Sequence, residues 1–165
     1  MLLKISTAIA AIALYGTLAN ASVLGTWSGE LTYSYLDEAN GTCTAENTVT
    51  QTETTLNFHQ VLSGSCNSAL DVNLDVNGND LLSNGVVVGS ITEDALVFEN
   101  VAIDSYGDTY SVNLTVNADG TAAFQDRFNY SGNPEDYDSL AGAMSPKAPE
   151  SVFSLNRNAK SIRHH

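Results

Sequence analysis

Apolar and polar residues alternate strictly along much of the chain. In the segment 27–35, Trp27, Leu31 and Tyr33 fall on one face, and serine, threonine and glutamate side chains fall on the other. A period of two with one apolar face is typical of an antiparallel strand that is buried on one side. The same alternation, or a composition rich in β-branched residues, predicts further strands at about 46–60, 70–76, 80–91, 94–105, 110–116 and 122–130.

Short turns separate these segments. Asn77-Gly78 and Asn84-Gly85 suit a two-residue hairpin turn or a glycine bulge. The run 117–120, Asn-Ala-Asp-Gly, suits a type I turn that a left-handed glycine closes. Consecutive strands joined by such turns predict an all-β meander, in which each strand lies beside the next one along the chain.

One helix is predicted near the C-terminus. Asn133 suits an N-cap, Pro134 the first helical position, and the acids at 135 and 136 the first turn, with the helix running to about Ala143. A short last strand is expected at 152–155. The fold expected is an antiparallel up-and-down barrel of about eight strands with one short helix near the C-terminus, and the alternative is a two-sheet β-sandwich.

The N-terminus has the features of a secretory signal peptide at residues 1–21. Lys4 precedes an apolar stretch at 5–18, and Ala19-Asn20-Ala21 is a small-x-small cleavage site. The expected organisation is therefore a signal peptide at 1–21, a β-barrel domain at 22–156 and a basic tail at 157–165. We expect an exported protein, periplasmic or extracellular. Stable membrane insertion is not expected, because the outward strand positions are polar.

The chain is strongly acidic. Six Lys and Arg residues face nineteen Asp and Glu residues, which gives a formal net charge of −13. This charge excludes the class of nucleic-acid binders, because phosphate contacts need basic side chains. Between residues 22 and 144 the only basic residue is Arg127, whereas the tail is basic. The tail either contacts an acidic surface or anionic partner, or it is a solubilising end.

Two cysteines, Cys43 and Cys66, lie in the part expected to be exported. Export favours a disulfide between them. No second cysteine pair is available for a metal site, and the segment 73–84 lacks the acidic twelfth position of a calcium loop. No catalytic motif, cofactor or metal is predicted.

Leu24-Gly25-Thr26-Trp27, at the start of the first strand, resembles the opening of calycin barrels, the lipocalin and avidin group. The late helix is similar to theirs as well. The resemblance implies an up-and-down barrel that holds a small ligand in its interior, with the tryptophan closing one end.

Asp126 stands out because it shares an apolar face with Phe124 and Phe128. A carboxyl group there either orients a ligand or acts as an acid of raised pKa. The alternatives are a hydrogen bond to a buried tyrosine, a bulge that turns the side chain outward, or a strand whose faces are wrongly assigned. The aromatic residues either line a ligand cavity or fill a packed core. The ligand-binding residues predicted are Trp27, Tyr33, Tyr35, Phe124, Asp126 and Phe128.

These observations favour an exported, non-enzymatic protein that binds a small, partly apolar ligand. The alternative is a secreted surface or interaction protein that acts through its outer face or its basic tail, with an unknown protein partner. A hydrolase with an acid pair is a third hypothesis, although no pair is singled out by spacing.

Overall fold

The computed structural model describes residues 22–148. In this range a single turn of 3₁₀ helix, Tyr130–Gly132, accompanies ten strands, and no helix is long and apolar enough to cross a membrane. The strands are β1 (Gly25–Tyr35), β2 (Glu38–Gln51), β3 (Thr55–Gly64), β4 (Ser68–Asn77), β5 (Asp80–Ser83), β6 (Val86–Ile91), β7 (Ala95–Ala102), β8 (Thr109–Val116), β9 (Ala122–Asn129) and β10 (Tyr137–Pro146).

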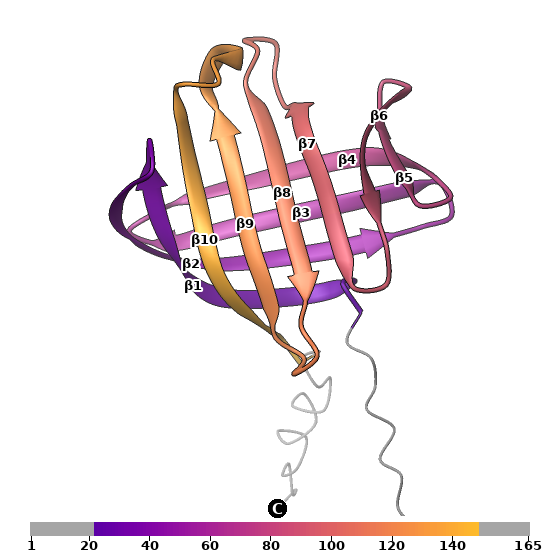
Figure 1. Ribbon diagram of the computed structural model, residues 1–165, viewed down its shortest axis with the longest axis horizontal. Coiled ribbons are helices and arrows are strands. Elements are labelled where there is room, and N and C mark those ends of the chain that lie inside the picture. Colours follow the sequence, from indigo (N-terminus) through magenta and orange to yellow (C-terminus); the bar gives the residue numbers. More distant parts are fainter. Residues whose placement is uncertain (1–21, 149–165) are drawn as a thin grey trace, which may run out of the picture.

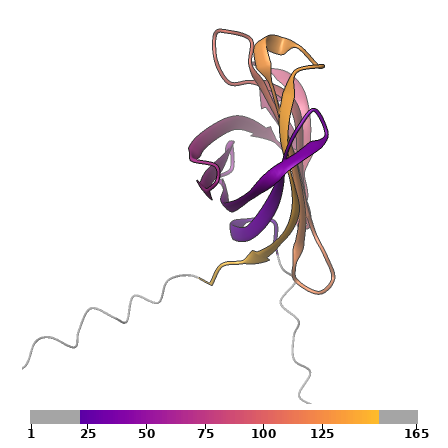
Figure 2. The same cartoon turned by 90° about the vertical axis from the view of Figure 1, so that its left-hand side faces the viewer.

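Every strand pairs antiparallel with its neighbours in sequence, and β10 returns to pair with β1, so the sheet closes into a ring. In Figure 1, β1 to β4 run across the back of the molecule, and β7 to β10 cross in front of them at a steep angle. Figure 2 shows the same two faces from the side. The all-β up-and-down architecture is therefore confirmed, with ten strands in place of about eight.

The ring is uneven where β5 and β6 complete it. β4 pairs with β5 only over 75–77, and β6 pairs with β7 only over 89–91. The first part of β4, Ser68 to Leu74, is thus paired with β3 but, within residues 22–148, has no pairing partner on the side toward β5. The expected strand at 46–60 is split by a turn at 52–54, in which Thr52 N donates to Thr55 O over 2.8 Å.

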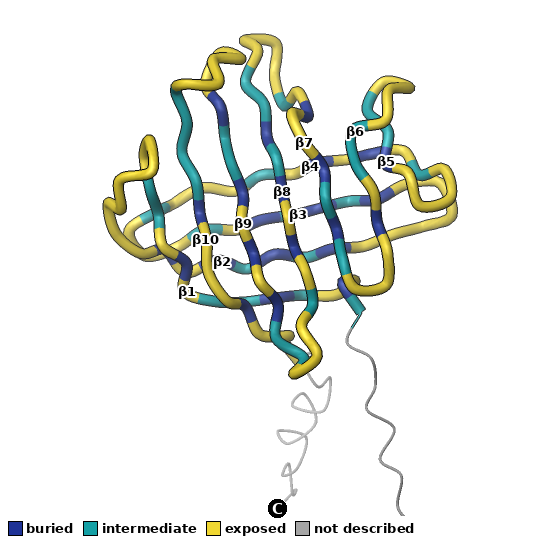
Figure 3. The backbone as a smooth tube through the Cα atoms, viewed as in Figure 1, coloured by how far each residue is buried: buried dark blue, intermediate teal, exposed yellow. Residues whose placement is uncertain are grey.

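The core follows the alternation that the sequence predicts. Inward positions are buried and outward positions exposed, as the banding of the strands in Figure 3 shows. At the centre four aromatic rings pack together, with Phe58 contacting Phe98, Tyr110 and Phe124 at centroid distances of 5.9, 6.1 and 6.4 Å. Aromatic pairs at such distances add to the stability that burial of their area provides.

One end of the ring is closed by the segment that precedes β1. Val23 N donates to Glu93 O over 2.8 Å, which holds this segment against the β6–β7 turn. The Trp27 indole Nε1 in turn donates to Val23 O over 3.0 Å. Both Val23 and Trp27 are almost fully buried, so this end is a packed core.

Two of the three predicted turns form at the expected residues, whereas at the third Asn77 still pairs with Asp80, so the turn residues are Gly78 and Asn79. Asn84 and Gly85 both have positive φ angles, 51° and 79°, which is the requirement of a type I′ hairpin turn between β5 and β6. Between β8 and β9, Gly120 N donates to Asn117 O over 3.0 Å, and Gly120 has a φ of 82°.

The predicted helix at 133–143 is wrong. Asn133 Oδ1 accepts from Glu135 N over 3.0 Å, and Asp136 N donates to Asn133 O over 3.2 Å, so the capping residues form a turn. The chain then extends into β10, because that segment pairs with both β9 and β1 and thereby closes the ring. The expected signal peptide at 1–21, the last strand at 152–155 and the tail at 157–165 lie outside the described residues.

A candidate ligand cavity at the open end of the ring

A cavity of about 510 Å³ lies at the end of the ring opposite Trp27. Its walls come from the last part of β1, the start of β2, the end of β3, the start of β4 and the neighbouring parts of β8, β9 and β10. Leu62, Leu70, Phe128 and Leu140 supply apolar wall area, and the β3–β4 turn lies at the edge. Pockets of this volume hold small molecules in many proteins.

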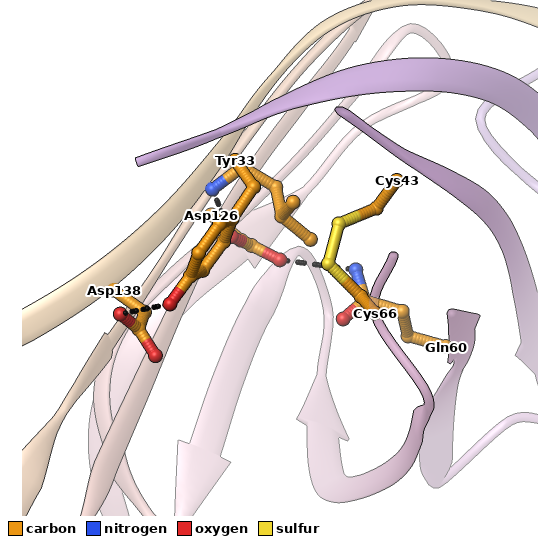
Figure 4. Close-up of a disulfide and its surroundings, with 7 residues drawn as sticks. Tyr33, Cys43, Gln60, Cys66, Asp126 and Asp138 are labelled. Atoms are coloured by element: carbon orange, nitrogen blue, oxygen red, sulfur yellow. Dashed lines mark hydrogen bonds between the residues drawn. A yellow bond between two sulfur atoms is a disulfide. The ribbon is translucent and has the colours of Figure 1, made fainter. Parts of the chain in front are cut away.

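The floor of the cavity carries a buried carboxyl group, Asp126, which is 4% exposed. Its Oδ2 accepts hydrogen bonds from the Tyr110 hydroxyl over 2.6 Å and from Gln60 Nε2 over 3.0 Å. Its Oδ1 accepts from Leu140 N over 2.8 Å. Figure 4 shows Asp126 and Gln60 approaching each other from opposite sides. Because three donors satisfy this carboxyl group, its burial on an otherwise apolar face is tolerated.

Burial also controls the protonation of this group. Loss of hydration raises the pKa of Asp126 to about 6, although the hydrogen bonds from Tyr110, Gln60 and Leu140 lower it. Burial, together with the nearby carboxyl group, raises the pKa of Tyr110 well above its usual value. Asp126 therefore changes its charge close to neutral pH, while Tyr110 stays a neutral hydrogen-bond donor.

A second carboxyl group, Asp138, lies higher in the cavity wall and is partly exposed. Its Oδ1 accepts from the Tyr33 hydroxyl over 2.8 Å, and its Oδ2 accepts from the Tyr130 hydroxyl. The bond to Asp138 raises the pKa of Tyr33, and burial together with that carboxylate raises the pKa of Tyr130. The mouth thus presents two neutral tyrosines that share one aspartate.

The predicted ligand-binding residues divide into three groups. Tyr33, Asp126 and Phe128 line the cavity. Trp27 and Phe124 do not, because both are buried in the core at 1% and 3% exposure. Tyr35 is 42% exposed and donates to Asp136 Oδ1 over 3.1 Å outside the cavity wall. Of the readings left open for Asp126, the structure shows the hydrogen bond to a buried tyrosine and excludes an outward bulge.

The predicted disulfide between Cys43 and Cys66 is confirmed, with the two Cα atoms 5.5 Å apart. Cys43 is buried in β2, and Cys66 follows β3 and lines the cavity. The bond ties the β3–β4 turn to β2 beside Gln60, as Figure 4 shows. It therefore fixes one side of the cavity mouth.

The cavity residues outside the predicted ligand-binding set include Gln60, Leu70, Tyr110 and Asp138. Tyr110 and Leu70 lie on the apolar faces of alternating segments, so both could be expected inside the ring. The sequence does not show which of these inward residues line a cavity. Asp138 stands in the segment predicted to be a helix, so its place in the cavity wall could not be predicted. Gln60 carried no signal of its own.

Among the described residues, those that line the cavity include two carboxyl groups and no lysine, arginine or histidine. Arg127 points away from it: its Nε donates to Asn129 Oδ1 over 2.8 Å, and its guanidinium lies 3.6 Å from the centre of the Tyr137 ring. Within residues 22–148 no three or more metal-ligating side chains come together.

Fold and cavity together define an all-β protein with an up-and-down antiparallel ring and a cavity at one end. The sequence matches no protein-family model and no curated protein. Among solved structures it is similar to a protein of unknown function of the DUF3598 family from Nostoc punctiforme, with 11% identity and a TM-score of 0.45. That match covers 77% of this chain and 44% of the other, so the chain spans less than half of its length.

Proposed function

We propose that this protein is an exported, non-enzymatic binder of a small, partly apolar ligand, which it holds in the cavity at the open end of the ring. The observation that carries the proposal is the cavity itself, about 510 Å³ with leucine and phenylalanine walls above a hydrogen-bonded polar floor. Mixed walls of this kind provide apolar contact area together with a few groups that orient a ligand.

Two further observations support the proposal. The closed end around Trp27 is what the resemblance to calycin barrels implies, and it leaves the opposite end free for a ligand. The bond between Cys43 and Cys66 favours an oxidising compartment, which agrees with the predicted signal peptide.

The first test is native mass spectrometry of the mature protein purified from its own source, followed by denaturing analysis of any released compound. A small molecule that leaves on denaturation supports the proposal and gives its chemical class. A bare protein mass, with no thermal shift across a panel of lipids and metabolites, argues against it.

A cavity-filling variant locates the binding site. Leu70→Trp adds an indole to the cavity wall, and Asn73→Trp places the same ring on the exposed outer face of the same strand. We expect Leu70→Trp to abolish ligand retention and Asn73→Trp to preserve it. Equal retention by both variants would place the ligand elsewhere.

A specific observation also favours the second candidate, an interaction protein that uses its outer face. Val86 and Val87 are 65% and 57% exposed, and within the described residues the stretch of β4 from Ser68 to Leu74 has no strand paired on its side toward β5. Exposed apolar groups and free edges are features of docking sites for extended protein segments. A Val86→Lys/Val87→Lys variant should lose such a partner, and unchanged partner binding would exclude this surface.

A further inference from the structure

The charge and the aromatic content of the cavity indicate a ligand class, on the assumption that the proposed binding function is correct. We propose that the ligand is a small organic cation, an amine with an apolar body. Its protonated nitrogen lies at the mouth beside Asp138 and the rings of Tyr33 and Tyr130, and its apolar body lies deeper against Leu70 and Phe128.

The first argument is the sign of the charged groups in the wall. Of the described residues that line the cavity, Asp126 and Asp138 are the charged ones, and none is basic. A ligand with a negative charge would face both carboxyl groups without a counter-ion. A cationic ligand instead supplies the positive charge that the described cavity wall lacks.

The second argument is the hydrogen-bonding capacity that remains at the mouth. Asp138 accepts from Tyr33 through one oxygen and from Tyr130 through the other. A carboxylate has about four acceptor sites, so each oxygen keeps capacity for a further donor. The two tyrosine hydroxyl protons are already given to Asp138, so they are not available to bind an anion. An ammonium group brings the donors that this arrangement lacks.

The third argument is the aromatic surface around Asp138. Tyr130 packs on Phe128 with ring centroids 4.9 Å apart, and both rings line the cavity, as does Tyr33. The faces of aromatic rings attract cations, most strongly where water is excluded. Carboxylate and rings together favour an organic ammonium over a metal ion, because in the described residues no third carboxyl or histidine completes a metal site.

The charge of the whole molecule also favours a cationic ligand. A net charge of −13 creates a negative potential that raises the local concentration of cations and lowers that of anions. This contribution is screened by salt, whereas the contacts inside the cavity are screened much less. Affinity for the cationic ligand should therefore fall with salt but persist at high salt.

Three probes of similar shape and different charge test the inference: tryptamine, the neutral alcohol tryptophol and the anion indole-3-propanoate. With the full chain at pH 7.5, isothermal titration calorimetry should show tryptamine binding at least about tenfold more tightly than tryptophol. Indole-3-propanoate should bind most weakly. Tighter binding of the alcohol or the anion overturns the cation inference and leaves the proposed binding function intact. Failure of all three probes, together with a bare native mass, overturns both.

A matched pair of variants locates the effect. Asp138→Asn removes the carboxylate at the mouth, and Asp75→Asn removes one from the exposed outer face of β4, so both change the net charge equally. Asp138→Asn should reduce the preference for tryptamine over tryptophol to within about twofold, and Asp75→Asn should leave it unchanged. An equal loss of this preference in both variants would show that it arises from the overall charge, and would overturn the proposed site at Asp138.

A second pair of variants tests the site without changing Asp138. Tyr130→Phe keeps the ring and removes the hydroxyl group, whereas Tyr130→Leu removes the ring face. We expect Tyr130→Phe to keep the preference for the cation and Tyr130→Leu to weaken it several-fold. Equal affinities of the two variants for tryptamine would show that the Tyr130 ring does not contribute to the binding site.

Discussion

The Tyr110 hydroxyl donates a hydrogen bond to Asp126 Oδ2 over 2.6 Å on the floor of the cavity, between two adjacent strands, β8 and β9. Gln60 Nε2 donates to the same oxygen from β3, which lies on the opposite face of the ring (Figure 1). This buried network therefore joins the two faces of the molecule, and it separates the aromatic core from the cavity. Its central group is an acid whose pKa is raised.

That raised pKa predicts a pH dependence of stability. The pKa of Asp126 is about 6 in the folded protein and 3.8 in the unfolded chain, so between these values the folded state binds the proton more strongly. The free energy of unfolding must then fall as the pH rises through this window and level off above it. The full contribution is about 3 kcal/mol, of which about 1 kcal/mol lies between pH 5 and 7.

The measurement is urea unfolding of wild type and Asp126→Asn at several values between pH 5 and 8. The two proteins differ only at residue 126, so the difference between their free energies of unfolding isolates the contribution of Asp126. The advantage of wild type over the variant should shrink as the pH rises to 7. Parallel pH profiles would show that Asp126 keeps an ordinary pKa.

Trp27 should govern stability and leave ligand binding unchanged. Trp27→Phe removes the hydrogen bond from Nε1 to Val23 O and leaves space in the closed end. We expect a loss of about 2 kcal/mol in the free energy of unfolding. Affinity for the cavity ligand should stay within about twofold. A large loss of affinity in a variant that remains folded would contradict the placement of the cavity.

The disulfide should contribute substantially to stability. Cys43 and Cys66 lie 23 positions apart in the sequence, and closing a loop of that length lowers the entropy of the unfolded chain. Reduction is expected to lower the free energy of unfolding by about 3 kcal/mol. The control is the Cys43→Ala/Cys66→Ala variant, whose unfolding curve should not respond to a reductant.

Gly89 is predicted to tolerate no side chain. A Cβ atom there would lie 2.0 Å from Val97 O and 2.6 Å from the Cα of Phe98, on the strand with which β6 pairs. Because these are backbone atoms, Gly89→Ala must displace β7, at a cost of about 3 kcal/mol. Gly142→Ala is the control, since its closest contact is the flexible end of Leu31 at 3.0 Å. Equal melting temperatures for the two variants would contradict this prediction.

The sequence predicted the strands best where a period of two was backed by turn chemistry. The inward faces of β1, β8 and β9 could be assigned because large apolar residues alternate with short polar ones. In β10 the alternation was masked, because small residues at 141–143 lie between Leu140 and Met144. Gly142 lies close against Leu31 of β1, a contact that only the tertiary structure reveals.

The helix prediction failed for a related reason. An asparagine that accepts a hydrogen bond from the backbone two residues later begins either a helix or a turn, and Asn133 does so before a turn. The choice was decided by the two strand edges that β10 joins, which lie far apart in the sequence. Asp138 could not be connected to Tyr33 for the same reason, since only closure of the ring brings β1 and β10 together.

The pairing of Trp27 with Pro146 places the first and last strands of the ring side by side at the closed end. Lys147 N still donates to Thr26 O over 2.7 Å there, so the described chain enters and leaves the ring on the side opposite the mouth. An anchor, a fusion partner or a solid support joined where the described chain enters or leaves the ring would hold the protein with the cavity mouth facing away from it. The start of β1 and the end of β10 are also close enough to be joined by a short linker. The chain could then be opened at another loop, which gives a circular permutation that keeps every strand pair.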